Sequence, residues 1–144
     1  MIRYATQEDV RRIWELICTL EERELDYLGF CSAYAEQQDD GRHIAFVWTD
    51  GAAHSDRILA LLNMRMEQQL HHAGRIAEVQ ELVVSPKLRG QGVGKQLLDR
   101  AVDEARRAGC LRLELVTNQR RLGAHRFYER EGMAQTHYGY TMDL

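Results

Sequence analysis

A glycine-rich turn between a strand pattern and a helix pattern constrains this chain most. Residues 75–84 are rich in strand-forming apolar residues and end at Ser85-Pro86. Residues 92–108 carry apolar residues at helical spacing, and Gly109 follows as a left-handed helix end. Glycines at 90, 92 and 94 let backbone N–H groups converge, and a helix N-terminus adds partial positive charge. We therefore expect an anion, in particular a diphosphate, to bind here.

Two common nucleotide-binding loops do not fit this turn. A Walker A loop has a glycine before its Gly-Lys pair and Ser or Thr after it, where this chain has Arg89 and Gln96. The dinucleotide pattern G-x-G-x-x-G places its last glycine on Lys95 or on Leu97, depending on the register. What remains is Arg89-x-x-Gly92-x-Gly94 after a strand.

The rest of the chain predicts a mixed α/β fold. A length of 144 residues with 44% hydrophobic residues fits a single domain over residues 1–144. Asp50-Gly51 is a hairpin-type breaker between two expected strands. We expect strands at 2–5, 43–48, 57–66, 75–84, 111–117 and 135–142, and helices from Thr6 to Cys18 and over 21–40, 92–108 and 124–132. This order indicates a mixed sheet with helices on its faces.

Composition excludes several classes of function. A net charge of -3 gives no overall attraction to nucleic acid or to an anionic membrane. No apolar run approaches the roughly 18 residues of a membrane span. The three cysteines lack CxxC spacing, so a disulfide framework and a zinc cluster are not indicated, and a reducing cytoplasm fits best.

The turn and its flanks resemble a known family. Arg89-x-x-Gly92-x-Gly94 after Val83-Val84 resembles the pyrophosphate loop of the GNAT superfamily of N-acetyltransferases, and residues 124–133 resemble the family's final motif. The resemblance implies a strongly twisted mixed sheet whose two central parallel strands, at 75–84 and 111–117, splay apart to admit pantetheine. It also implies acetyl-CoA as cofactor.

Three further segments resemble one branch of that family. They are Leu70-His-His, residues 78–84 and residues 117–128, and they look like the aminoalkylphosphonate N-acetyltransferases of bacterial phosphonate metabolism. The resemblance implies direct transfer of acetyl to the primary amine of a small aminoalkylphosphonate by a cytoplasmic homodimer. Another amine acceptor, such as an aminoglycoside, a polyamine or a peptide N-terminus, stays open, as does a CoA-binding protein without catalysis.

The resemblance also implies which residues bind the cofactor. Backbone groups of the strand end pair with pantetheine, the turn holds the pyrophosphate, and an asparagine after the next strand hydrogen-bonds the pantetheine. These cofactor-binding residues are Leu82, Val83, Val84, Arg89, Gly90, Gln91, Gly92, Val93, Gly94, Lys95 and Asn118. Asn118 has an equally reasonable role as a turn-forming residue.

Amide formation from a thioester needs a base for the amine and an acid for the thiolate. The family places the base on the strand before the loop, which indicates Glu78, with Glu81 as the alternative. Strand alternation puts these two side chains on opposite faces unless a bulge intervenes. Tyr128 lies where the family carries its acidic tyrosine, although it is also suited to packing.

Two adjacent histidines raise the question of a metal. Side chains next to each other in a strand point to opposite faces, so His71 and His72 can share one ion only in an irregular turn. Ordinary polar loop histidines are the simpler explanation of the pair. Because the phosphonate branch is associated with divalent metal, His71 stays a candidate ligand.

Overall fold

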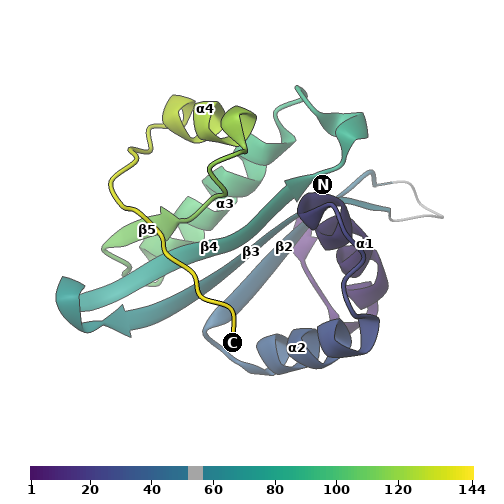
Figure 1. The fold of residues 1–144 in the computed structure, drawn as a ribbon, viewed down its shortest axis with the longest axis horizontal. Helices are drawn as coiled ribbons and strands as arrows, with labels where there is room; N and C mark the ends of the chain where they lie inside the picture. Colours follow the sequence, from purple (N-terminus) through teal and green to yellow (C-terminus); the bar gives the residue numbers. More distant parts are fainter. Residues whose placement is uncertain (52–56) are drawn as a thin grey trace. The chain divides into compact units, whose positions relative to one another are not determined.

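A computed structural model describes residues 1–51 and 57–144 (Figure 1). The described chain forms two compact units, Met1–Glu114 and Leu115–Leu144. Part of the expected hairpin connection, residues 52–56, lies outside the described residues. The single domain over 1–144 stays a prediction.

The first unit contains most of the helices and strands. Its elements are β1 (Ile2–Tyr4), η1 (Gln7–Asp9), α1 (Val10–Glu21), α2 (Tyr27–Asp39), β2 (His43–Thr49), β3 (Ile58–Gln69), η2 (Leu70–His72), β4 (Gly74–Val84), η3 (Pro86–Leu88) and α3 (Val93–Arg107). Strand β5 (Arg112–Leu115) ends at the boundary, and the second unit holds α4 (Leu122–Arg130). The sequence predicted each of these strands and α-helices, with the largest difference at the start of α2, which begins at Tyr27 and not at residue 21.

The strands form one sheet in the order β1-β2-β3-β4-β5. Strands β1 to β4 are antiparallel neighbours, as their short connections require. Strand β5 follows the crossover helix α3 and runs parallel to β4, beginning where Leu111 N donates to Arg75 O at 2.8 Å. The sheet is therefore mixed, as predicted.

Helices cover both faces of this sheet. On one face, α1 and α2 contribute apolar side chains to a core with Val47, Leu61 and Val83 of the strands; these helix residues are Ile13, Leu16, Ile17 and Tyr34. The alternate strand residues point to the other face, where the Arg100 guanidinium of α3 lies 5.2 Å from the ring centre of Phe46. The mixed α/β sheet with helices on both faces is confirmed (Figure 1).

The start of the first helix is held by a carboxylate. Asp9 accepts hydrogen bonds from Thr6 N at 2.8 Å and from two nitrogens of Arg3 at 2.7 and 3.0 Å. Burial acts to raise the pKa of Asp9, but the hydrogen bonds from Arg3 and Thr6 outweigh it and lower that pKa. Thr6 and Asp9 thus cap the chain's entry into α1, as the sequence indicated.

The prediction of a strand at residues 135–142 is wrong. Residues 133–144 are described but form neither helix nor strand. Their alternating apolar side chains Tyr138, Tyr140 and Met142 are all exposed. A strand pattern becomes a strand only beside another strand, and within the described second unit α4 is the only complete element.

The described helices include none that is long and apolar enough to cross a membrane.

Candidate active site

The turn between β4 and α3 has the backbone geometry of an anion site. Gly90 and Gly92 have φ of +77° and +76°, the left-handed region that glycine tolerates best. The first hydrogen bond of α3 runs from Gln96 N to Gly92 O at 3.1 Å. The N–H groups of residues 93–95 therefore precede the first intrahelical donor, at the positive end of the helix dipole.

Side chains around the turn differ in how they are held. Val93 is buried and anchors the start of the helix. Gln91 Nε2 donates to Lys87 O at 3.1 Å, which ties the turn to η3. Lys95 Nζ lies 3.0 Å from Asp99 Oδ2, while Arg89 is exposed. The turn is thus tied to η3 by Gln91, and Arg89 is an exposed cation beside it.

The end of β4 leads directly into this turn. Residues Leu82, Val83 and Val84 pair with β3 on one side. Since β5 starts beside Arg75 and is four residues long, it reaches only about the middle of β4. The predicted pantetheine-binding segment therefore lies beyond the length that β5 covers.

A bulge in β4 changes the predicted alternation of its side chains. Glu81 pairs with Asn63 and Val79 with Met64, so Gln80 is the extra residue. Glu78 then pairs with Arg65. Because residues 63 and 65 of β3 share a face, both glutamates point to the α1 and α2 side of the sheet. The sequence predicted that only a bulge would allow this, but it did not show where one occurs.

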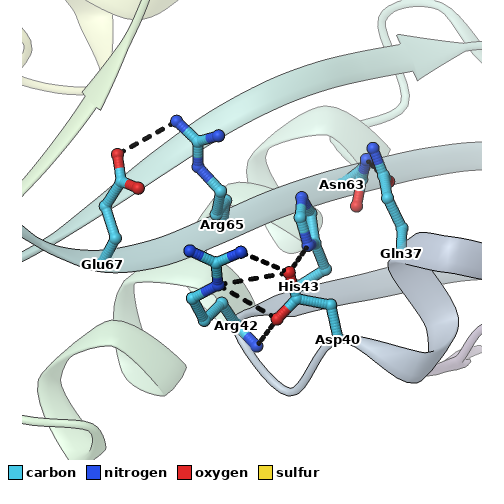
Figure 2. Close-up of polar contacts among 7 residues, drawn as sticks. All are labelled: Gln37, Asp40, Arg42, His43, Asn63, Arg65 and Glu67. Carbon is cyan, nitrogen blue, oxygen red and sulfur yellow. Dashed lines mark hydrogen bonds and ion pairs between the residues drawn. The ribbon is translucent and has the colours of Figure 1, made fainter. Parts of the chain in front are cut away.

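Glu81 is the more enclosed of the two carboxyl groups. Its Oε2 accepts a hydrogen bond from Asn63 Nδ2 at 2.8 Å. The same amide donates to Gln37 Oε1 of α2 at 2.9 Å, and Figure 2 shows these two side chains next to each other. Burial raises the pKa of Glu81, the hydrogen bond from Asn63 opposes the shift, and Glu21 adds to it. Glu81 is thus a fixed carboxyl group whose pKa lies above its usual value.

Glu78 lies in a more open and more charged place. Its Oε2 is 3.8 Å from Arg65 Nη2, and both side chains are about one-third exposed. Arg65 Nη2 also donates to Glu67 Oε1 at 3.0 Å (Figure 2). The arginine is therefore flanked by two carboxylates on this face.

The second unit contains the other two predicted residues. Asn118 Oδ1 accepts from Arg120 N at 3.0 Å, so the turn-forming role is present, while the amide nitrogen stays available as a donor. Tyr128 lies on α4, where burial raises its phenol pKa and Arg121 opposes that shift. The raised pKa means that the phenol holds its proton at neutral pH.

His71, the predicted metal ligand, is not joined by enough further ligands among the described residues to bind a metal ion. His71 and His72 have ring centres 4.1 Å apart in η2, and His72 Nδ1 lies 2.8 Å from Gln69 Oε1. Among the described residues, no group of three or more His, Cys, Asp or Glu side chains could hold a metal ion. The residues present do not fit a metal site made by the protein alone.

Sequence reasoning missed three polar residues near the glutamates, namely Gln37, His43 and Asn63. Asn63 is buried although it lies in the apolar run ILALLNMRM. A polar side chain in such a run needs a hydrogen-bond partner. That signal could have indicated Asn63 as a residue with a specific role, but its partners depend on the bulge and on α2.

Comparisons with known proteins agree with this geometry. The model of the acetyltransferase (GNAT) family matches residues 3–133. The aminoalkylphosphonate N-acetyltransferase of Salmonella typhimurium is 42% identical over 144 residues, covering 99% of this chain and 90% of that protein.

Solved structures share the fold over the whole chain. One, described as a transcriptional regulator from Bacillus halodurans, has a TM-score of 0.90 at 25% identity and covers 100% of this chain and 99% of its own. The glucosamine-6-phosphate N-acetyltransferase of Arabidopsis thaliana has a TM-score of 0.82 at 22% identity, and the match covers 99% of this chain and 97% of that chain. The match to the family model and the 42% identity over nearly the whole chain show that the chain belongs to the GNAT family of acetyltransferases.

Proposed function

We propose that this enzyme transfers the acetyl group of acetyl-CoA directly to the primary amine of a small aminoalkylphosphonate. Membership of the family supports acetyl-CoA as the acetyl donor. The observation that carries the choice of acceptor is the 42% identity over nearly the whole chain to a protein of that name. Two glutamates on one sheet face, beside an arginine, are compatible with an acceptor that carries both an amine and an acidic group.

The turn before α3 would hold the diphosphate of acetyl-CoA. The N–H groups of residues 93–95 and the exposed Arg89 supply donors and positive charge. Backbone groups of Leu82, Val83 and Val84 would pair with pantetheine, and one N–H there would polarise the thioester carbonyl. Bound acetyl-CoA supplies the thioester, and the protein supplies position and proton transfer.

One of the two glutamates would take the proton from the amine. Glu81 suits this role because burial raises its pKa toward neutrality and Asn63 fixes its orientation. Its Oε1 accepts no hydrogen bond from the described residues, so that atom is available to receive a proton directly or through water. Glu78, the choice from sequence, stays the alternative.

Tyr128 would supply a proton from its phenol to the departing thiol. Its raised pKa keeps it protonated until the thiolate forms. The amide nitrogen of Asn118 would donate to pantetheine.

Thiol release from acetyl-CoA in the presence of different amines tests this function. The panel contains aminoalkylphosphonates, aminoglycosides, polyamines and peptide N-termini, each with and without a chelator. We expect the highest kcat/KM with an aminoalkylphosphonate. Highest efficiency with another amine would replace the acceptor, and no turnover with any amine would favour a CoA-binding protein without catalysis. Loss of turnover with chelator would show a metal requirement that the described residues do not explain by themselves.

The homodimer and the cytoplasmic location stay predictions from the sequence. Sedimentation equilibrium of the purified chain measures the first, and fractionation of cells measures the second.

A further inference from the structure

Two rows of polar side chains cross the sheet on the face of α1 and α2. In one row Asn63 of β3 pairs with Glu81 of β4. In the next row His43 of β2, Arg65 of β3 and Glu78 of β4 lie side by side. Both rows share one face, because residues 63 and 65 are two apart in the same strand.

The second row contains nitrogen atoms whose hydrogen-bonding capacity is unused. Arg65 Nε and His43 Nδ1 are buried and have no hydrogen-bond partner among the described residues. The dashed line from Nδ1 of His43 to Asp40 Oδ2 in Figure 2 marks an ion-pair contact of 3.3 Å, which does not have the geometry of a hydrogen bond. A buried polar nitrogen without a partner is costly, and native proteins rarely leave one. Arg65 Nε is a donor, and His43 Nδ1, on the adjacent strand, is a donor in one of its two tautomers, so a ligand that offers acceptor oxygens would satisfy both.

Arg65 is held in a way that suits ligand binding. One guanidinium nitrogen binds Glu67 at 3.0 Å and lies 3.8 Å from Glu78, which fixes the side chain across the face. A guanidinium has five N–H donors in a rigid fork, so most of them remain for a second acceptor. The two carboxylates orient the arginine without using all of its donors.

The spacing of the two rows matches a short bifunctional molecule. Residues two apart in a strand are separated by about 6.6 Å. A primary amine at Glu81 and an acidic group at Arg65 would thus be joined by a short alkyl chain. A polyamine has no acidic group, and a peptide offers one at that distance only where its first residues carry a carboxylate.

We propose that Arg65, with His43 beside it, binds the acidic group of the acceptor substrate and makes the enzyme selective for short amines that carry an oxyanion. This inference rests on the proposed function, because it assigns the acceptor end of the same site. Phosphonate and carboxylate share the chemistry that the pair recognises, and a phosphonate offers one more oxygen.

Kinetics with matched substrates test this assignment. Acetyl transfer to 2-aminoethylphosphonate is compared with transfer to ethanolamine, which has the same amine and no acidic group. Arg65→Gln should lower kcat/KM for the phosphonate about 10- to 100-fold more than for ethanolamine, mainly through KM. Arg65→Lys should recover part of the loss, because lysine restores the positive charge but not the planar guanidinium with its several N–H donors. The control is Arg57→Gln, an arginine that pairs with Asp50 just before β3.

Binding without turnover separates this inference from the proposed function. Calorimetry with ethylphosphonate, in the presence of saturating CoA, reports the acidic-group site even if the acceptor is wrong. We expect Arg65→Gln to weaken this binding at least 10-fold, and Arg57→Gln to leave it unchanged.

Each outcome decides one claim. Equal losses with 2-aminoethylphosphonate and with ethanolamine would make Arg65 a structural partner of Glu67 and Glu78 and overturn the inference. Unchanged ethylphosphonate binding in Arg65→Gln and in Arg65→Lys would do the same. Absence of acetyl transfer by the wild-type enzyme to every amine would reject the proposed function, whereas selective loss of ethylphosphonate binding would still support the site.

Discussion

The turn before α3 and the polar rows on the sheet contribute to the candidate site in different ways. In the turn, main-chain N–H groups would bind the diphosphate, and their arrangement depends on Gly90 and Gly92, whose φ angles are positive. On the sheet, side chains do the work, and the bulge at Gln80 decides which of them share a face. A backbone site is therefore damaged by a change of shape, whereas a side-chain site is damaged by a change of chemistry.

The largest expected effect comes from breaking the shape of the turn. Gly92→Asp should weaken acetyl-CoA binding about 100-fold or more, because a carboxylate at φ of +76° strains the turn and repels the diphosphate. Calorimetric titration of the folded variant measures this.

Helix α3 itself provides the control for that change. Gly109 has the same φ of +76° and equally open surroundings, but it lies at the other end of the helix. Gly109→Asp should destabilise the protein similarly and leave cofactor affinity unchanged. Equal affinity in Gly92→Asp and wild type would remove the turn from the cofactor site.

This difference also explains what the sequence could predict. The glycine spacing at 90, 92 and 94 is visible in the sequence, and it was enough to predict the turn. Helical periodicity likewise predicted α1 and α3. The shared face of Glu78 and Glu81 was not predictable, because nothing in EVQELVV marks Gln80 as the bulged residue. The prediction of a strand at residues 135–142 was wrong for another reason, because a strand pattern does not specify which strand lies beside it.

The second prediction changes the chemistry of the sheet and keeps its shape. Glu81→Gln should lower kcat about 10²- to 10³-fold, because an amide still accepts the Asn63 hydrogen bond but cannot take a proton. Glu78→Gln should lower kcat less than 10-fold. Steady-state turnover at saturating substrate compares the two variants. The reverse order of effects would return the base role to Glu78.

A third prediction extends the chemical test to the second unit. Tyr128→Phe keeps the ring and removes the acidic proton, so kcat should fall about 10²-fold while the fold is retained. Turnover is measured across pH, with circular dichroism as the check on folding. Tyr138→Phe, at a tyrosine that is 82% exposed, is the control. Near-wild-type turnover would leave Tyr128 with a packing role only.

A smaller effect should come from a charged side chain in the turn. Lys95 is exposed on α3 and pairs with Asp99, so water and that carboxylate offset much of its attraction for a bound diphosphate. Lys95→Gln should therefore weaken acetyl-CoA binding only about 2- to 5-fold, with backbone donors unchanged. Titration against the wild type measures it. A loss as large as that of Gly92→Asp would mean that side-chain charge, not backbone shape, governs the turn.

The smallest effect concerns stability and follows from the burial of Glu81. Because burial raises the pKa of Glu81 in the folded protein, its stabilising contribution is present below the unfolded pKa and is lost as pH rises through the folded pKa. At neutral pH the ionised carboxylate therefore destabilises the fold relative to glutamine.

Glu81→Gln should raise Tm by about 1–3 °C at pH 7, and this gain should shrink as pH falls toward about 4. Thermal unfolding at the two pH values measures the difference, with Glu36→Gln, at an exposed position of α2, as the control for lost charge. A lower Tm for Glu81→Gln at pH 7 would mean that the added strength of the Asn63 hydrogen bond to an ionised carboxylate outweighs burial, and Glu81 would then be a structural carboxylate that is poorly suited to act as a base.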